Sequence, residues 1–351
     1  MVPDTLKQTG LAFLPSVFWL VFAVAIAVVV SVVIYLTHLW FSKGPEVGVC
    51  RCETRMDGKT VIVTGSNTGT GKEAARDLAR RGARVILACR NARKAEKAAE
   101  EIRKSSGNGN VEVRVLDLSS LSSVRDFCTH ILQTEPRLDV LVNNAGFSPI
   151  LRIRSKICYC PRMETTDGFE LMFGVNHLGH FLLTSLLLDL LKKSAPSRVV
   201  TVSSGGHTLE PRIDFKDINF QHNFSPTRAY RRSKLANMLF VRELAKRLEG
   251  TGVAAFSMTP GYVANPTSRL TNQTLSVGML FWGTVAALHR WMYGKTPLQG
   301  AQTTIHCSVA DGLQSGQYFS DCKPKDPAPQ AMDDEAARKL WELSEKMVAL
   351  K

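Results

Sequence analysis

The chain has 351 residues, of which 44% are hydrophobic and 21% charged, so it can bury a full core and is too hydrophobic for a disordered tail protein. Its 44 Lys and Arg residues against 31 Asp and Glu give a net charge of +13, which suits a nucleic acid, a membrane surface or a phosphate-bearing ligand. Because the sequence has no basic run of five residues and no basic stretch interleaved with aromatic residues, nucleic-acid binding is not expected.

The first predicted element is a transmembrane anchor over 11–37, a stretch without charge between Lys7 and Lys43, preceded by a tail at 1–10. At about 1.5 Å per residue, a helix of this length exceeds a hydrocarbon core of ~30 Å. A cleaved signal peptide, which would make the protein secreted, is the alternative, but bulky residues follow where a cleavage site needs small ones. The basic residues after the anchor predict that the rest of the chain is cytosolic, at the endoplasmic reticulum membrane.

The predicted juxtamembrane linker at 38–55 contains Cys50 and Cys52, two of eight scattered cysteines. This pair and the second close pair, Cys158 and Cys160, each lack the second half of a four-ligand zinc site, so no metal site is predicted and a reducing compartment is the simpler interpretation. Reversible acylation of Cys50 and Cys52 is an alternative to two unmodified thiols.

Past the linker, short β-branched runs alternate with segments of helical length, which predicts an α/β fold with a doubly wound parallel sheet of the Rossmann type. The runs lie at 59–65, 83–90, 111–118, 138–146, 197–204, 252–261 and 316–322. We assign 56–322 to one nucleotide-binding domain and 323–351 to an extension that contains a capped amphipathic helix over 333–350.

The first of these runs ends in a glycine loop, TGSNTGTGK, which opens the next helix. Glycines allow a tight turn and a close approach to a pyrophosphate, which the helix N-terminus then binds. A phosphate-binding P-loop needs a different glycine-to-lysine offset and a Ser or Thr after the lysine, so a dinucleotide is favoured. The predicted cofactor-binding residues here are Gly65, Ser66, Asn67, Thr68, Gly69, Thr70 and Gly71.

The second run should end beside the adenosine ribose, and there the sequence has Cys89-Arg90 with no acidic residue before Glu96. A carboxylate at this place would bind the 2′-hydroxyl of NAD, whereas an arginine suits the 2′-phosphate of NADP. Lys72, in the first turn after the glycine loop, adds a nearby positive charge. The sequence therefore favours NADP(H) over NAD(H).

Several motifs together resemble the short-chain dehydrogenase/reductases over 56–322: the glycine loop, LDLSS at 116–120, NNAG at 143–146, VNHLGHF at 175–181, VSS at 202–204, YRRSK at 230–234 and Pro260-Gly261. The anchor and the helical stretches resemble the retinol dehydrogenase branch, and the tail is similar to that of its dehydrogenase/reductase member 13-like relatives. The resemblance implies further cofactor contacts at Asp117, Leu118, Asn144, Ala145, Gly146, Pro260 and Gly261.

The same resemblance implies a catalytic set of Asn176, Ser204, Tyr230 and Lys234. Ser204 would hydrogen-bond the substrate oxygen, Tyr230 would exchange its proton, and Asn176 would hold a relay water. Lys234, one helical turn from Tyr230, would bind the nicotinamide ribose and lower the phenol pKa. An ordinary solvated helix face is what the Tyr230 and Lys234 spacing would indicate without the other motifs.

Three places depart from the family pattern. Thr70 replaces a usual Ile or Leu. Extra residues follow Pro260-Gly261, so Asn265 and Thr267 compete for the nicotinamide amide. The segment 147–162 is longer and more basic than expected; a membrane-surface contact or a splice variant is favoured over a substrate-side flap.

We expect a membrane-anchored, NADP-dependent enzyme for a lipophilic alcohol and carbonyl pair, with retinol and retinal first. A different lipid or steroid carbonyl, and a catalytically silent NADP-binding scaffold at the membrane, are the alternatives. The apolar stretch 275–292 is too short to span a bilayer and is either a lid resting on the membrane or a core helix. Homo-oligomer formation is compatible with the sequence, which does not specify it.

Overall fold

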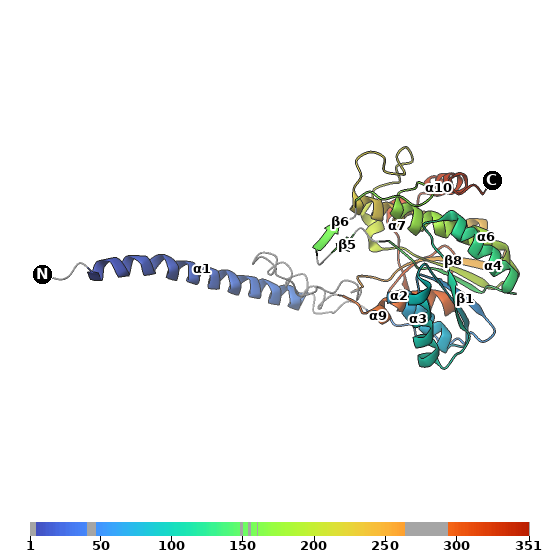
Figure 1. The fold of residues 1–351 in the computed structure, drawn as a ribbon, viewed down its shortest axis with the longest axis horizontal. Helices are drawn as coiled ribbons and strands as arrows, with labels where there is room; N and C mark the ends of the chain where they lie inside the picture. Colours follow the sequence, from blue (N-terminus) through green and yellow to red (C-terminus); the bar gives the residue numbers. More distant parts are fainter. Residues whose placement is uncertain are drawn as a thin grey trace. The chain divides into compact units, whose positions relative to one another are not determined.

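The computed structural model describes residues 5–40, 47–147, 150–153, 156–159, 161–263 and 294–350. The chain divides into two units, Met1–Glu46 and Val47–Lys351, and we call the second the main unit. The first unit contains one helix, α1 (Thr5–Trp40), which includes the predicted anchor and an apolar stretch over Val21–Tyr35 (blue in Figure 1). That α1 spans a membrane stays a prediction.

One sheet organises the main unit and confirms the predicted fold class. Its strand order is β10-β9-β8-β7-β4-β1-β2-β3, and every neighbouring pair from β9 to β3 is parallel. Each predicted run contains one of these strands. The strands are β1 (Thr60–Thr64), β2 (Arg84–Cys89), β3 (Val111–Val115), β4 (Val140–Asn143), β7 (Ser197–Val202), β8 (Val253–Thr259), β9 (Tyr318–Ser320) and β10 (Lys323–Pro324).

Helices cover both faces of this sheet, because alternate residues of each strand point to opposite sides. In β1, Ile62 joins a core with α4, α6 and α7, whereas Val61 and Val63 join a second core with α2, α3 and α9. Figure 1 shows these two helix groups on opposite sides of the sheet. The helices are α2 (Gly69–Arg80), α3 (Ala92–Ser106), α4 (Leu121–Thr134), α6 (Gly179–Lys193), α7 (Pro226–Arg247) and α9 (Pro297–Val309).

The stretch Leu171–Lys193 is apolar and long enough to cross a membrane, yet 78% of its 18-residue apolar window is buried in the main unit. It comprises α5 (Leu171–Phe173), a π-helical turn η1 (Gly174–Leu178) and α6. Burial between the sheet and α4 explains the apolar composition, so this is a core helix. The π-helical turn is where Asn176 lies, and such turns often occur at functional sites.

The C-terminal extension contains the expected amphipathic helix, which packs against α7. Helix α10 (Asp334–Met347) starts at Asp333, whose carboxylate accepts a hydrogen bond from Ala336 N. Trp341 stacks on Phe240 of α7 with 5.9 Å between ring centroids, and the guanidinium of Arg247 lies 4.5 Å from the Trp341 ring centroid. These contacts make the extension part of the larger hydrophobic core.

Within the long segment 147–162, the described residues form a separate pair of strands, which we call the β5–β6 hairpin. Its strands, β5 (Ile150–Ile153) and β6 (Lys156–Tyr159), are antiparallel and pair with each other in a two-stranded sheet. At its C-terminal end, Arg162 donates to the backbone oxygens of Asn219 and Phe220. The predicted segment 275–292, Asn265 and Thr267 lie outside the described residues.

Candidate active site

The site forms where the strand order reverses, at the carboxyl ends of β1 and β4. After β1 the chain builds β2 and β3 on one side and then returns to place β4 on the other, and in open α/β sheets ligands bind outside the strand ends at such a reversal. The glycine loop follows β1, and residues 144–146 follow β4. The topology therefore brings the two predicted cofactor motifs together.

Glycine is required at two places in this loop. Gly65 has a φ of 64°, and a Cβ there would lie 2.9 Å from the α-carbon of Ala145. A Cβ on Gly71 would collide with the side-chain amide of Asn144 and lie 2.8 Å from Gly65 O. Helix α2 begins at Gly69, and the preceding Thr68 makes no side-chain capping hydrogen bond. First-turn N–H groups of α2 thus remain to bind an anion, which fits a cofactor pyrophosphate.

Hydrogen bonds lock the loop after β4 onto the glycine loop. The Thr64 hydroxyl accepts from the backbone N–H groups of Asn144 and Ala145, both at 2.9 Å. The Asn144 amide donates to Thr64 O at 2.8 Å, and the Thr70 hydroxyl donates to Asn144 Oδ1 at 3.2 Å. Thr70, which departs from the family pattern, therefore has a structural role. Gly146 at the end of this loop is exposed.

Asn176 is fully buried and acts on the backbone next to Gly146. Its Oδ1 accepts from Phe147 N at 2.6 Å, and its Nδ2 donates to Ser233 Oγ at 2.9 Å. Its carbonyl oxygen lies 3.1 Å from His180 Nδ1, and Nε2 of the same ring lies 2.8 Å from Thr64 Oγ1. The sequence analysis missed His180, although its place four residues after Asn176 puts both on one helix face.

Burial lowers the pKa of His180 to about 4. The imidazole is therefore neutral at cytosolic pH, and one ring nitrogen donates while the other accepts. With Nδ1 donating to the Asn176 carbonyl, Nε2 accepts from Thr64. His180 thus links Asn176 to the residue that fixes the loop after β4, which makes it a positioning residue.

Ser204, Tyr230 and Lys234 meet beside this loop. Ser204 follows β7, and its hydroxyl accepts from Gly206 N at 3.1 Å and hydrogen-bonds the Tyr230 phenol. Lys234 Nζ lies one turn further along α7, 5.8 Å from the Tyr230 ring centroid, and donates to Val202 O at 3.1 Å. Only 3.4 Å separates this ammonium from the position of a Cβ on Gly146.

The expected lowering of the Tyr230 pKa is wrong for the chain alone. Burial raises the pKa of the phenol, and the hydrogen bond with Ser204 offsets this only in part. Burial also lowers the pKa of Lys234 to about 8. The physical reason is desolvation, which disfavours the charged form of each group. The Lys234 ammonium does not offset it, because it donates to Val202 O and lies 5.8 Å from the centroid of the Tyr230 ring.

At the adenosine end, Arg90 is exposed just past β2 and makes no hydrogen bond or ion pair with any residue that the structure describes. Lys72, expected to add charge here, is paired with Glu101 of α3. Asp117 Oδ1 accepts from the Ser119 N–H at 2.9 Å and from the Ser119 hydroxyl at 2.6 Å. Arg90 therefore has a free guanidinium for a phosphate, whereas Lys72 is already neutralised.

The turn at Pro260-Gly261 follows β8. Gly261 has a φ of 77°, and a Cβ there would lie 2.9 Å from the ammonium of Lys295. Lys295 is 6% exposed. Its side chain forms an ion pair with Asp321, and its backbone forms a β-bridge with Val263. Sequence patterns gave no reason to single out Lys295.

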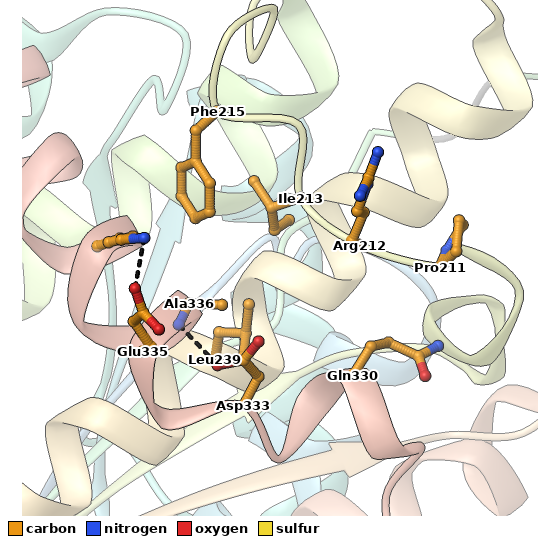
Figure 2. Close-up of a pocket in the computed structure, with 10 residues that line it drawn as sticks. Pro211, Arg212, Ile213, Phe215, Leu239, Gln330, Asp333, Glu335 and Ala336 are labelled. Carbon is orange, nitrogen blue, oxygen red and sulfur yellow. Dashed lines mark hydrogen bonds and ion pairs between the residues drawn. The ribbon is translucent and has the colours of Figure 1, made fainter.

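A separate cavity of about 230 Å³ lies between the 211–215 segment, α7 and α10 (Figure 2). Ile213, Phe215 and Leu239 supply its apolar lining, and Glu335 and Lys339 lie on the α10 side. It contains none of the predicted site residues, so the chemistry is assigned to the strand ends and not to this cavity.

Comparisons with known proteins agree with the geometry. Residues 59–276 match the sequence profile of the short chain dehydrogenase family. Human retinol dehydrogenase 14 is 49% identical over 310 residues, which cover 84% of this chain and 88% of that protein.

Solved structures extend the likeness to three dimensions. An uncharacterised protein from Mycobacterium paratuberculosis has a TM-score of 0.66 and 36% identity, covering 87% of this chain and 98% of its own. Pseudomonas aeruginosa RhlG, solved as an NADP active-site complex, has a TM-score of 0.58 and 26% identity, covering 76% and 96%.

Proposed function

We propose that this chain, which belongs to the retinol dehydrogenase branch of the short-chain dehydrogenase family, transfers a hydride between NADP(H) and a lipophilic alcohol or carbonyl, with retinol and retinal as the pair. The coarser activity, nicotinamide-dependent oxidoreduction, follows from the family. The observation that carries the proposal is the contact of the Tyr230 phenol with Ser204 beside buried Lys234, where the glycine loop and residues 144–146 converge.

The proposed roles follow from the state of each group. Burial keeps the Tyr230 phenol protonated at cytosolic pH, so it is ready to donate a proton to a carbonyl oxygen. The Ser204 hydroxyl, already bonded to the phenol, holds that oxygen in the same place. When bound, the nicotinamide supplies or accepts the hydride.

Lys234 and Asn176 act on the surroundings of the phenol. With its pKa lowered to about 8, Lys234 can give up or hold a proton near neutral pH, and its position beside Gly146 suits contact with the cofactor ribose. Asn176 accepts a hydrogen bond from Phe147 N and so holds the loop that faces Lys234. In alcohol oxidation the phenol must first lose its proton, which the hydrogen bond with Ser204 favours and burial opposes.

The choice of NADP(H) rests on Arg90. Its guanidinium is exposed and unpaired among the described residues, at the strand end where the adenosine ribose lies in this fold. The carboxylate that would bind the free ribose hydroxyls of NAD is absent, because Cys89 precedes Arg90 and the exposed Asn91 follows it. Relatives named as retinol dehydrogenases support a retinoid substrate.

Location at the endoplasmic reticulum membrane, with the main unit in the cytosol, is part of the proposal. The apolar helix α1 supports it, as do the basic residues that follow. Asn223, exposed in an Asn-Phe-Ser sequon, provides the test. A shift in gel mobility on deglycosylation of the membrane-expressed protein would contradict a cytosolic main unit.

The function is tested by turnover of the purified full chain in detergent. NADPH and NADH are each offered with all-trans-retinal, a steroid ketone and a saturated alkyl aldehyde, and the reverse reaction uses NADP⁺ with retinol. We expect the highest kcat/KM with NADPH and retinal. Preference for the steroid or alkyl substrate would overturn the retinoid assignment, and NADPH binding without turnover of any substrate would indicate a silent scaffold.

A further inference from the structure

The first residues of the main unit pack against helices α2 and α9. Residues 47–55 were predicted as part of a linker, yet Cys50 N donates to Gln302 Oε1 of α9 at 3.0 Å. Arg81 of α2 donates to the carbonyl oxygens of Cys52 and Thr54. A Cβ on Gly48 would overlap the backbone of Asp321, so the segment also packs closely against the end of β9.

This docking completes a cluster that sequence spacing could not reveal. Cys50 Sγ, Cys52 Sγ and one ring nitrogen of His306 all lie within 4.8 Å of one another. The Cys52 Sγ to His306 Nδ1 distance is 3.8 Å. In a tetrahedral zinc site with Zn–S ≈ 2.3 Å and Zn–N ≈ 2.0–2.1 Å, a sulfur and a nitrogen ligand lie about 3.6 Å apart. The observed separation therefore needs little adjustment.

We propose that Cys50, Cys52 and His306 bind a zinc ion that fastens the segment after the first unit to helix α9. Three protein ligands leave a fourth position for water, an arrangement that Cys2His zinc sites with an open position have and closed four-ligand structural sites lack. The site is independent of the proton-transfer residues. Its consequence is structural: α9 packs on α2, and Gly300 of α9 meets Thr70 in the glycine loop.

Burial opposes both a thiolate at Cys50 and a charged imidazole at His306. Burial lowers the pKa of His306, so the ring is neutral and free to bind a metal. Burial raises the pKa of the Cys50 thiol to about 11, while the Arg81 guanidinium acts in the opposite direction. A metal must therefore displace a proton from this thiol, and binding weakens as the pH falls.

The test uses the full chain, purified in detergent, freed of any affinity tag, reduced and stripped of metal. Cobalt(II) is the spectroscopic probe, because thiolate ligation produces an intense charge-transfer band in the near ultraviolet. We expect one equivalent of cobalt to produce the band and one equivalent of zinc to abolish it. Zinc should also raise the Tm, because the ligand binds the folded chain.

Two variants remove the ligands, and one matched variant keeps them. Cys50→Ser with Cys52→Ser, and separately His306→Gln, should lose the cobalt band and the zinc-dependent rise in Tm. Cys128→Ser with His130→Gln, a thiol and an imidazole on α4 outside the cluster, should retain both. NADPH binding by fluorescence shows in each case that the chain is folded.

Three results would overturn the proposal. One is a cobalt band that survives both ligand substitutions in folded protein. Another is the absence of a band in the folded parent. The last is a disulfide between Cys50 and Cys52 in protein isolated without reductant, combined with no metal uptake after reduction.

Discussion

The nucleotide side and the substrate side of the main unit are held in different ways. On the nucleotide side, Gly65 and Gly71 lie against residues 144–145 so closely that a methyl group would not fit. On the side that we propose for the substrate, β5 and β6 pair only with each other among the described strands, and Val263 forms a β-bridge with Lys295. We therefore propose that cofactor binding and proton transfer reside in this closely packed part of the fold, and that the β5–β6 hairpin affects substrate preference alone.

A large expected effect on turnover distinguishes chemistry from binding. Ser204→Ala removes the hydroxyl that touches the Tyr230 phenol and would hold the substrate oxygen. We expect kcat to fall by roughly 10²–10³-fold, as when one oxyanion donor is removed, with NADPH affinity unchanged. Thr208→Ala, on the same 3₁₀ turn but exposed, is the control and should retain turnover. A parent-like kcat in Ser204→Ala would remove this residue from the site.

A smaller effect tests how the nucleotide side chooses its cofactor. Arg90→Asp should shift the kcat/KM ratio from NADPH toward NADH by roughly ten- to a hundredfold, since a hydrogen bond to a charged group contributes about 1.5–3 kcal/mol. Because Lys72 is paired with Glu101, we expect it to retain little of the NADPH preference. Lys104→Asp, at the far end of α3, controls for net charge. An unchanged ratio would mean that Arg90 does not meet the 2′-phosphate.

Close packing of the two cofactor loops can be broken directly. Gly71→Ala places a methyl group against Asn144 and Gly65 O, and overpacking of this kind costs about 1–3 kcal/mol. We expect a lower free energy of unfolding and weaker NADPH binding. Gly109→Ala, where no atom lies within 4 Å of a new Cβ, should leave both unchanged. Equal stability of the two variants would contradict the close packing assigned to the nucleotide side.

The smallest effect is expected on cofactor binding when the substrate side is altered. Deleting residues 148–160 removes the β5–β6 hairpin, which pairs only within itself among the described strands. We expect the Kd for NADPH to stay the same and the KM for the carbonyl substrate to change. Weaker NADPH binding after the deletion would show that the hairpin supports the nucleotide side, and the contrast between the two sides would fail.

The same contrast explains how far the sequence could be interpreted. β-branched runs and the glycine loop predicted the sheet, because strand burial and tight turns impose local residue choices. His180 was missed because its role depends on Thr64, which lies more than a hundred residues away in the sequence. Lys295 was missed because its role depends on a β-bridge with Val263. The pKa of Tyr230 was also mispredicted, because four-residue spacing reveals a neighbouring charge but not the depth of burial.

The most direct test of the central claim, that the Tyr230 phenol carries the proton, separates binding from turnover in Tyr230→Phe. Cofactor affinity is measured by NADPH fluorescence and kcat by retinal reduction, beside Tyr318→Phe, which removes another buried phenol. The account predicts unchanged NADPH affinity and a loss of kcat of roughly 10²–10⁴-fold in Tyr230→Phe alone, the usual contribution of a general acid. A kcat within a few fold of the parent, with cofactor still bound, would contradict it.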